Sequence, residues 1–359
     1  MRVAQVLTAS EGGIGRHVAS LVPRLVDRGH QVTVYCPDST AQAHDFAALA
    51  VRPGVEIWPL SHLRRARVAD VVHAHGYKAG ALALVACAVG GPSVVVTWHN
   101  AILGRGRRRL VGQLSQRLVA RGAALTLGAS SDLVDQARHL GARAARLWPV
   151  AAPVLPAVGS DRTRLRAELG LTDGDVLVLT VGRLAPQKNL DLVLDTAGRL
   201  KDRSWLRFGI VGGGPEAERL AVRIEAESLP VDLLGHRPDI AALLDAADIA
   251  LLTSTWEARA LVAQEALLAG LPLVSTRVGG IEELVGDAAL LVPPDDAAAA
   301  AAALLELAED PVRRAALAAA GRVRAATWPD EDAVADDVVA AYVDVLGPQP
   351  TCPLGNDVE

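Results

Sequence analysis

The chain has 359 residues, of which 51% are hydrophobic, and this is enough apolar material for two domains of ordinary size. Its formal net charge of −5 argues against nucleic-acid binding, and no long apolar window is free of charges and turn residues, which argues against a membrane-spanning helix. The three cysteines are isolated and odd in number, so they indicate neither a disulfide framework nor a cysteine metal site, and a reduced cytoplasmic setting is expected.

The first half of the chain alternates short β-branched strands with amphipathic helices. Continuous apolar strands between helices are typical of parallel sheets that are covered on both faces. The predicted strands are 3–8, 31–35, 70–75, 93–99 and 124–128, and the predicted helices lie near 15–28, 78–89 and 107–121.

A proline-rich segment, 147–161, follows the first half. Pro149, Pro153 and Pro156 cannot continue a helix or a central strand, so this segment is the predicted interdomain linker. We therefore assign residues 1–150 to a first domain and 151–329 to a second.

The second half repeats the pattern of the first. Two such halves predict an α/β protein with two Rossmann-like, doubly wound parallel-sheet domains. The tail, 347–359, is predicted to be disordered. The predicted strands are 175–182, 207–212, 231–235, 248–253 and 271–275, and the predicted helices are 189–200, 216–227, a helix ending near 269, and the Ala-rich run 295–307.

The loop SEGGIGRHV (10–18) joins the first strand to the first helix, and its glycines let backbone N–H groups approach a phosphate or a sugar. A dinucleotide-binding loop is a competing interpretation, because Asp38 follows the second strand as a ribose-binding acid would. The run from Gly13 to Val18 lacks the last glycine of that fingerprint, so an NAD(P) enzyme is the weaker alternative.

Three histidines lie near the ends of strands in the first half. His99 follows the buried run VVVTW (94–98), and His73 and His75 lie in the preceding strand. Strand alternation points His73 and His75 to the same face, where they would form half of a metal site. No acidic or cysteine partner at ligand spacing accompanies them, so a packed or acceptor-facing role is favoured.

The stretch GRGRRRLVGQLSQRLVARG (104–122) combines an apolar stripe with a cluster of arginines. Two interpretations stay open: an interfacial helix that docks on anionic lipid, and a core-facing helix with a solvated basic face. The stripe consists of Leu110, Val111, Leu114 and Leu118, and the arginines are Arg105, Arg107, Arg108, Arg109, Arg117 and Arg121.

In the second half, VGRLAPQKN (181–189) places Arg183 and Lys188 where a strand opens into a helix. A planar guanidinium and a compact ammonium are suited to neutralising the charge of a diphosphate. The glycine run VGGGP (211–215) lies at the next strand-to-helix turn, where the backbone can approach a ligand and the helix N-terminus favours anions.

Glu257 and Glu265 lie eight residues apart, where an apolar strand gives way to an amphipathic run. On one helix this spacing gives a rise of about 12 Å and two different faces. If both serve one ligand, Glu257 belongs to the loop and Glu265 to the early turns of the helix, at the usual ligand crevice of an open α/β sheet. With these motifs the chain resembles a family 4 retaining glycosyltransferase of the GT-B fold, most strongly across 181–292.

The resemblance implies a metal-independent hexosyltransferase without a cofactor, whose two domains face a central cleft. The donor would be a UDP- or GDP-linked sugar held mainly by the second domain, and the acceptor would lie on the first. It also implies a front-face reaction in which the leaving phosphate takes the acceptor proton. A mechanism in which Glu257 acts as a covalent nucleophile is the minority view. A last helix, about 330–346, would cross back onto the first domain.

The resemblance also implies the role of each site residue. Glu257 contacts the sugar hydroxyls or the reaction centre, Glu265 the ribose, and His99 the transferred sugar. Arg183 and Lys188 bind the diphosphate. The further donor-binding residues are Gly13 from the form G-G-x-x-x-H-V, Gly182, the turn residues Gly212, Gly214 and Pro215, and Arg237 near the base.

One departure from the family lies between the two glutamates. Many members carry E-G-F-G there, with a glycine backbone touching the donor, whereas this chain has Glu257-Ala258-Arg259-Ala260. Arg259 is expected to add a charge near the sugar pocket. This departure supports a rival hypothesis, a non-catalytic nucleotide-sugar-binding protein.

A second rival is another GT-B enzyme such as a nucleotide-sugar epimerase. The acceptor stays open between a lipid-linked and a small-molecule glycan precursor. The protein is expected in the cytoplasm, with peripheral contact to the inner membrane face through 104–121.

Overall fold

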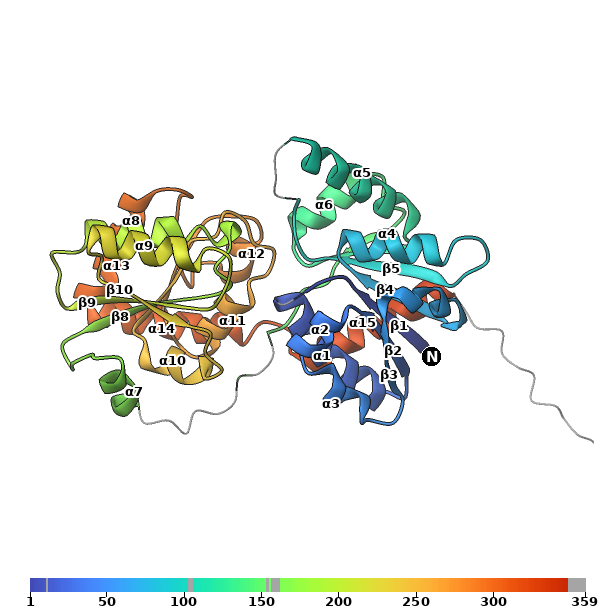
Figure 1. The fold of residues 1–359 in the computed structure, drawn as a ribbon, viewed down its shortest axis with the longest axis horizontal. Helices are drawn as coiled ribbons and strands as arrows, with labels where there is room; N and C mark the ends of the chain where they lie inside the picture. The colour runs from blue at the N-terminus through green and yellow to red at the C-terminus, as the bar shows by residue number, and fades with distance from the viewer. Residues whose placement is uncertain (11, 103–105, 153–154, 156–161, 348–359) are drawn as a thin grey trace, which may run out of the picture.

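The computed structural model describes residues 1–10, 12–102, 106–152, 155 and 162–347, and they form two α/β units side by side (Figure 1). Each unit contains a parallel sheet, one of seven strands and one of six. The predicted fold class is therefore confirmed. The predicted tail, apart from Gly347, and most of the linker from 153 onward lie outside the described residues.

The first sheet has the order β3-β2-β1-β4-β5-β6-β7. The strands at its two edges, β3 and β7, are absent from the predicted set because most of their residues are at least partly exposed. The strands are β1 (Arg2–Leu7), β2 (Gln31–Cys36), β3 (Val55–Pro59), β4 (Val71–His75), β5 (Ser93–Trp98), β6 (Leu125–Gly128) and β7 (Ala145–Leu147).

The second sheet repeats this topology with the order β10-β9-β8-β11-β12-β13. Its edge strand β13 has three residues and is likewise absent from the predicted set. The strands are β8 (Val176–Val181), β9 (Leu206–Val211), β10 (Val231–Gly235), β11 (Ile249–Leu252), β12 (Leu273–Thr276) and β13 (Leu290–Val292).

Helices connect the strands. The first domain contains α1 (Gly13–Asp27), α2 (Asp38–Ala43), α3 (Phe46–Ala50), η1 (Leu60–Val68), α4 (Tyr77–Ala86), α5 (Gly106–Gly122) and α6 (Ser131–His139). The second contains α7 (Arg162–Glu168), η2 (Pro186–Lys188), α8 (Leu190–Arg199), α9 (Ala217–Glu227), α10 (Ile240–Ala246), α11 (Leu261–Leu268), α12 (Ile281–Val285), α13 (Ala297–Glu309) and α14 (Pro311–Ala325). The chain ends with α15 (Glu331–Leu346).

Successive residues of one strand enter different cores, as expected for a sheet covered on both faces. In β8, Val176 and Val178 belong to the core that α8 and α13 cover, whereas Leu177 and Leu179 belong to the core beneath α10 and α11. This double burial explains the continuous apolar strands in the sequence.

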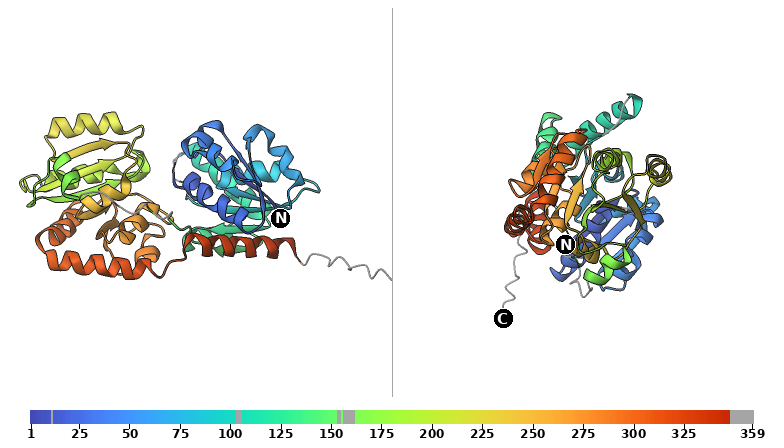
Figure 2. Two further views of the ribbon diagram at one scale, coloured as in Figure 1. Left: turned by 90° about the horizontal axis from the view of Figure 1, so that it is seen from below. Right: turned by 90° about the vertical axis from the view of Figure 1, so that its left-hand side faces the viewer.

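The last helix, α15, lies along the first domain rather than the second (Figure 2). Val334, Val338 and Tyr342 are buried in the first domain's core, and the Trp148 indole Nε1 donates to the backbone oxygen of Val334 at 3.1 Å. The C-terminal helix therefore contributes side chains to the interior of the N-terminal sheet.

No helix among the described residues is both long enough and apolar enough to span a membrane.

Candidate active site

Both sheets have a topological switch point, between β1 and β4 in the first and between β8 and β11 in the second. Open α/β sheets bind ligands at the carboxyl ends of the strands there. Contacts between the domains join segments at these ends. The indole Nε1 of Trp256, in the loop after β11, donates to Asp132 in the first turn of α6 at 3.2 Å, and the Ser131 backbone N–H of α6 donates to Glu283 of α12 at 3.0 Å. The predicted site therefore lies where the domains meet.

Lys188 and Glu257 form an ion pair in the second domain. The Lys188 ammonium lies 2.6 Å from Glu257 Oε1, which also accepts a hydrogen bond from the Ser254 hydroxyl at 2.7 Å. Glu257 is 8% exposed and lies in the loop between β11 and α11, as its spacing predicted. A buried carboxylate beside a cation presents one group for phosphate oxygens and one for hydroxyls.

Glu265 lies in the second turn of α11, also as predicted, and is 2% exposed. Its Oε1 lies 2.5 Å from Nη2 of Arg16, which belongs to α1 in the first domain. Sequence reasoning missed Arg16, although it lies within the predicted glycine loop, 10–18. At Gly13 an added Cβ would lie 3.2 Å from the Leu261 side chain of α11. The absence of a side chain at Gly13 therefore allows α1 to pack close to α11.

The glycine run after β9 is held against the loop after β8. A Cβ at Gly212 would lie 1.9 Å from the Gly182 backbone oxygen, and one at Gly214 would lie 2.4 Å from that of Leu184. Both positions also have positive φ angles. The packing of the chain on itself therefore requires these two glycines, with or without a ligand, and Pro215 follows them at the exposed surface.

Two predicted arginines follow strands of the same sheet, β8 and β10, which β9 separates. Arg183 follows β8 and is exposed. Arg237 follows the edge strand β10 and makes two bonds to Asp239, at 2.8 and 2.5 Å. The ion pair between Arg237 and Asp239 raises the pKa of Arg237 and lowers that of Asp239. No described contact joins Arg237 to Glu257 or Glu265.

His99 lies directly after β5, and its Nε2 is 3.0 Å from Nδ1 of His75. Burial lowers the pKa of both imidazoles well below 6.5, so both are neutral at physiological pH. His17 packs against them, with ring centroids 5.9 Å from His75 and 5.7 Å from His99. Burial lowers its pKa to about 4, and its Nε2 is enclosed with no hydrogen-bond partner among the described residues.

His73 joins the same cluster, its ring centroid 4.3 Å from that of His75. The packed role favoured from the sequence therefore agrees with its burial. The described residues contain no group of three or more His, Cys, Asp or Glu arranged to hold a metal ion.

The side chain of Arg259 contacts the end of the first domain and Trp328. Its Nε donates to the backbone oxygen of Val150 at 3.0 Å, at the end of the first domain, and its guanidinium lies 5.5 Å from the Trp328 ring centroid. Ala258 and Ala260 on either side are buried. Burial lowers the pKa of Arg259 to about 10, so the side chain stays charged at neutral pH. Arg259 therefore ties the second domain to the linker.

The apolar stripe of α5 does not face the core. Leu110, Val111, Leu114 and Leu118 are each 56–62% exposed, and α5 forms an outer edge of the first domain (Figure 1). The helix instead buries Val119 and Ala120. Of the two interpretations of this stripe, the core-facing one is therefore wrong.

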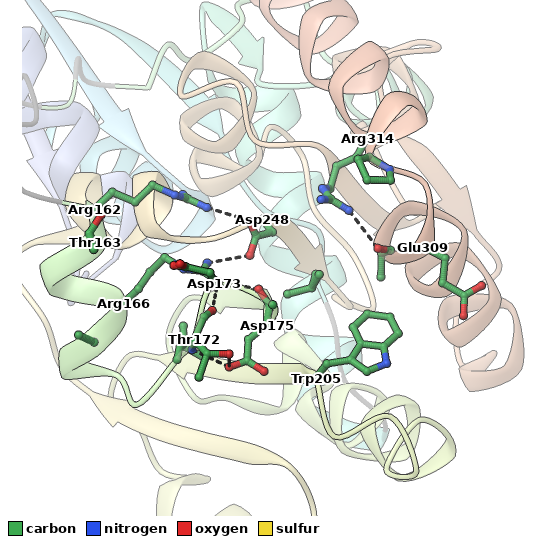
Figure 3. A pocket seen from close by; sticks show the side chains of 16 residues that line it. Arg162, Thr163, Arg166, Thr172, Asp173, Asp175, Trp205, Asp248, Glu309 and Arg314 are labelled. Atoms are coloured by element: carbon green, nitrogen blue, oxygen red, sulfur yellow. Dashed lines mark hydrogen bonds and ion pairs between the residues drawn. The ribbon is translucent and has the colours of Figure 1, made fainter.

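A pocket of about 860 Å³ lies elsewhere in the second domain (Figure 3). It is lined by Asp175, Trp205 and Asp248, which immediately precede β8, β9 and β11, so it lies at the amino ends of the strands. Arg162 and Arg166 each bond to Asp248 at 2.8 Å. These arginines stabilise the base of the sheet, opposite the predicted site.

Comparisons with known sequences agree with the two-domain arrangement. The family described as "Glycosyl transferases group 1" matches residues 161–324, and "Glycosyl transferase 4-like domain" matches residues 12–152. A D-inositol 3-phosphate glycosyltransferase of Rhodococcus opacus is 32% identical over 76% of this chain and 67% of its own length. A glycogen synthase of Rhodopseudomonas palustris is 30% identical over 68% and 62%.

Solved structures share the fold. The Anabaena protein Alr3699/HepE, crystallised with UDP, has a TM-score of 0.81 at 21% identity and covers 95% of this chain and 99% of its own. The lipopolysaccharide-biosynthesis glycosyltransferase WaaG has a TM-score of 0.73 at 18% identity, with coverage of 95% and 99%. Together with the sequence relatives, this identifies the chain as a member of the group 1, family 4-like glycosyltransferases of the GT-B fold.

Proposed function

We propose that the chain transfers a hexosyl unit from a nucleotide-diphosphate sugar to an acceptor hydroxyl, with retention of configuration and without a metal ion. The observation that carries this proposal is the pairing of Lys188 with the buried Glu257 at the carboxyl ends of β8 and β11. UDP-glucose is the first donor to test, because a solved protein of the same fold carries that ligand.

In the proposed reaction the leaving diphosphate develops negative charge, and Arg183 and Lys188 neutralise it. Glu265 accepts hydrogen bonds from the ribose in place of Arg16, and Glu257 accepts them from the sugar. The acceptor oxygen bonds to the anomeric carbon on the face from which the phosphate oxygen departs, and that phosphate oxygen takes the acceptor proton. His99 contacts the transferred sugar from the first domain.

The remaining predicted donor contacts complete the proposal. The backbone at Gly13 and Gly182 would approach the phosphates, and the turn 212–215 would face the nucleotide. Arg237 would lie near the base. Its bonds to Asp239 hold the guanidinium in place, so a base would stack on it or meet its edge.

The first acceptor to test is D-inositol 3-phosphate, because several relatives are named for it. We also propose a cytoplasmic protein that docks peripherally on anionic lipid through α5, whose exposed stripe lies among arginines in the sequence. A lipid-linked acceptor would be presented at that surface.

The departure Ala258-Arg259-Ala260 still supports the rival of a non-catalytic binder, which would bind the nucleotide sugar without forming a product. Product analysis tests the proposal and both rivals together. UDP-glucose and D-inositol 3-phosphate are incubated with EDTA, and the anomeric configuration of the product is read by NMR. We expect an α-linked glucoside. A β-linked product would contradict retention, and an epimerised nucleotide sugar formed without acceptor would support the epimerase.

A further inference from the structure

His99 is one end of a buried hydrogen-bond relay that reaches the last helix of the chain. His75 Nδ1 lies 3.0 Å from His99 Nε2, and His75 Nε2 lies 2.7 Å from Gln5 Oε1. The Gln5 amide Nε2 donates to the Tyr342 hydroxyl at 3.0 Å. Gln5 is in β1 and Tyr342 in α15, and both are fully buried.

The chemistry of the amide sets the direction of this relay. A carbonyl oxygen only accepts, so the His75 Nε2 facing Gln5 Oε1 carries a proton. Because His75 is neutral, its Nδ1 carries none and accepts from His99 Nε2. The neutral His99 is then left with an unprotonated Nδ1.

Nδ1 of His99 has no hydrogen-bond partner among the described residues, and it is not one of the fully enclosed unpartnered atoms. It is therefore the ring nitrogen that a ligand can reach. A neutral imidazole that presents a lone pair accepts a hydrogen bond from a hydroxyl. It also adds no positive charge beside an oxocarbenium-like centre, where an imidazolium would be repelled.

Tyr342 keeps the amide of Gln5 in this orientation. Its hydroxyl accepts from Gln5, and it can donate its own proton to Nδ1 of His73 at 2.7 Å. His73 Nε2 then donates to the Thr97 hydroxyl at 2.6 Å. If the Gln5 amide were rotated by 180°, its Oε1 and Nε2 would exchange places. Each hydrogen bond of the relay would then have to exchange its donor and acceptor, so the contacts stabilise one another.

We propose that Gln5 and Tyr342 are positioning residues that hold His99 in its Nε2–H tautomer and so give the donor sugar a hydrogen-bond acceptor at Nδ1. This inference rests on the proposed function, because it assumes that His99 meets the transferred sugar. Thr97 lies beyond His73, outside the branch from Gln5 to His99, and offers a matched control.

The test uses the full chain labelled with ¹⁵N-histidine, in the wild type and in Gln5→Met, Tyr342→Phe and Thr97→Val. Two-bond ¹H–¹⁵N spectra report the tautomer, with His99 assigned by its loss in His99→Asn. We expect Nε2–H in the wild type and in Thr97→Val, and a mixture of tautomers in the other two. UDP release from UDP-glucose should fall roughly tenfold in kcat in Gln5→Met, because about one hydrogen bond to the transition state is lost, with KM changed less than about twofold.

The outcomes separate the inference from the proposed function. An Nδ1–H tautomer in the wild type, or an unchanged Nε2–H in both Gln5→Met and Tyr342→Phe, would overturn the relay whatever the activity. A mixed tautomer with full kcat would leave the relay standing but overturn its role in the reaction. Comparable melting temperatures in Thr97→Val and Gln5→Met, with loss of turnover only in the latter, would exclude a merely structural role.

Discussion

The Lys188 ammonium lies 2.6 Å from the carboxylate of Glu257, and the two residues come from the ends of adjacent strands, β8 and β11. Glu257 is buried, and its Oε1 accepts hydrogen bonds from the lysine and from the Ser254 hydroxyl. The pair brings together two predicted site residues that are 69 positions apart in sequence.

The first prediction concerns UDP binding by this pair. Lys188→Ala should weaken UDP binding by about 1.5–3 kcal/mol, because a charge-assisted bond to the diphosphate is lost. Lys201→Ala is the matched control, since Lys201 is an exposed lysine on the same domain and should leave affinity unchanged. Titration calorimetry measures both, and equal affinities in the two variants would rule out Lys188 as a phosphate ligand.

Arg259 provides the second prediction. Arg259→Ala removes the bond to Val150 and the contact with Trp328, so the free energy of unfolding should fall by about 1–3 kcal/mol. Affinity for UDP-glucose should stay within about twofold of the wild type. Urea unfolding and calorimetry provide the two values. The opposite pattern, unchanged stability with weakened binding, would show that Arg259 contacts the donor sugar.

A third prediction follows from the buried histidines. The folded pKa is about 4 for His17 and about 3 for His73, and it is well below 6.5 for His75 and His99. Between pH 6.5 and 4 the unfolded chain therefore binds more protons than the folded one, so stability falls as pH falls. His17 and His73 each contribute up to about 1.4 kcal/mol per pH unit within this window, and His75 and His99 add to the slope in the same direction. Urea midpoints that stay constant from pH 7 to 5 would contradict neutral buried imidazoles.

The fourth prediction concerns α5. Replacing Leu114 and Leu118 with glutamine should abolish sedimentation with vesicles rich in phosphatidylglycerol, because the apolar contact area is lost. Replacing Val312 and Val323, exposed on α14, should have no effect. The wild type should release from vesicles as salt rises. Binding that is equal in both double variants would exclude this surface.

The sequence was sufficient to predict the central strands and the residues at their ends. Their continuous apolar runs reflect burial on both faces, and the spacing of Glu257 and Glu265 placed one in a loop and the other on a helix. The edge strands β3, β7 and β13 were missed because few of their residues are buried, so their sequences lack the continuous apolar run of the central strands.

Other features depended on contacts that no local pattern encodes. Arg259 lies next to the site in sequence, yet its side chain extends to Val150 and Trp328. Gln5 and Tyr342 are 337 positions apart and meet only because α15 returns to the first domain. Arg16 of the first domain likewise meets Glu265 of the second only because the two domains pack against each other.

The most direct measurement of the central claim is the thermal unfolding of the wild type and of Glu265→Ala with UDP, GDP or ADP and their sugar conjugates, without added metal. A nucleotide at 100 times its dissociation constant should stabilise the wild type by about 2.7 kcal/mol. The account predicts that one nucleotide class does so and that Glu265→Ala loses most of the shift. The absence of a shift with every nucleotide, or an equal shift in Glu265→Ala, would contradict it.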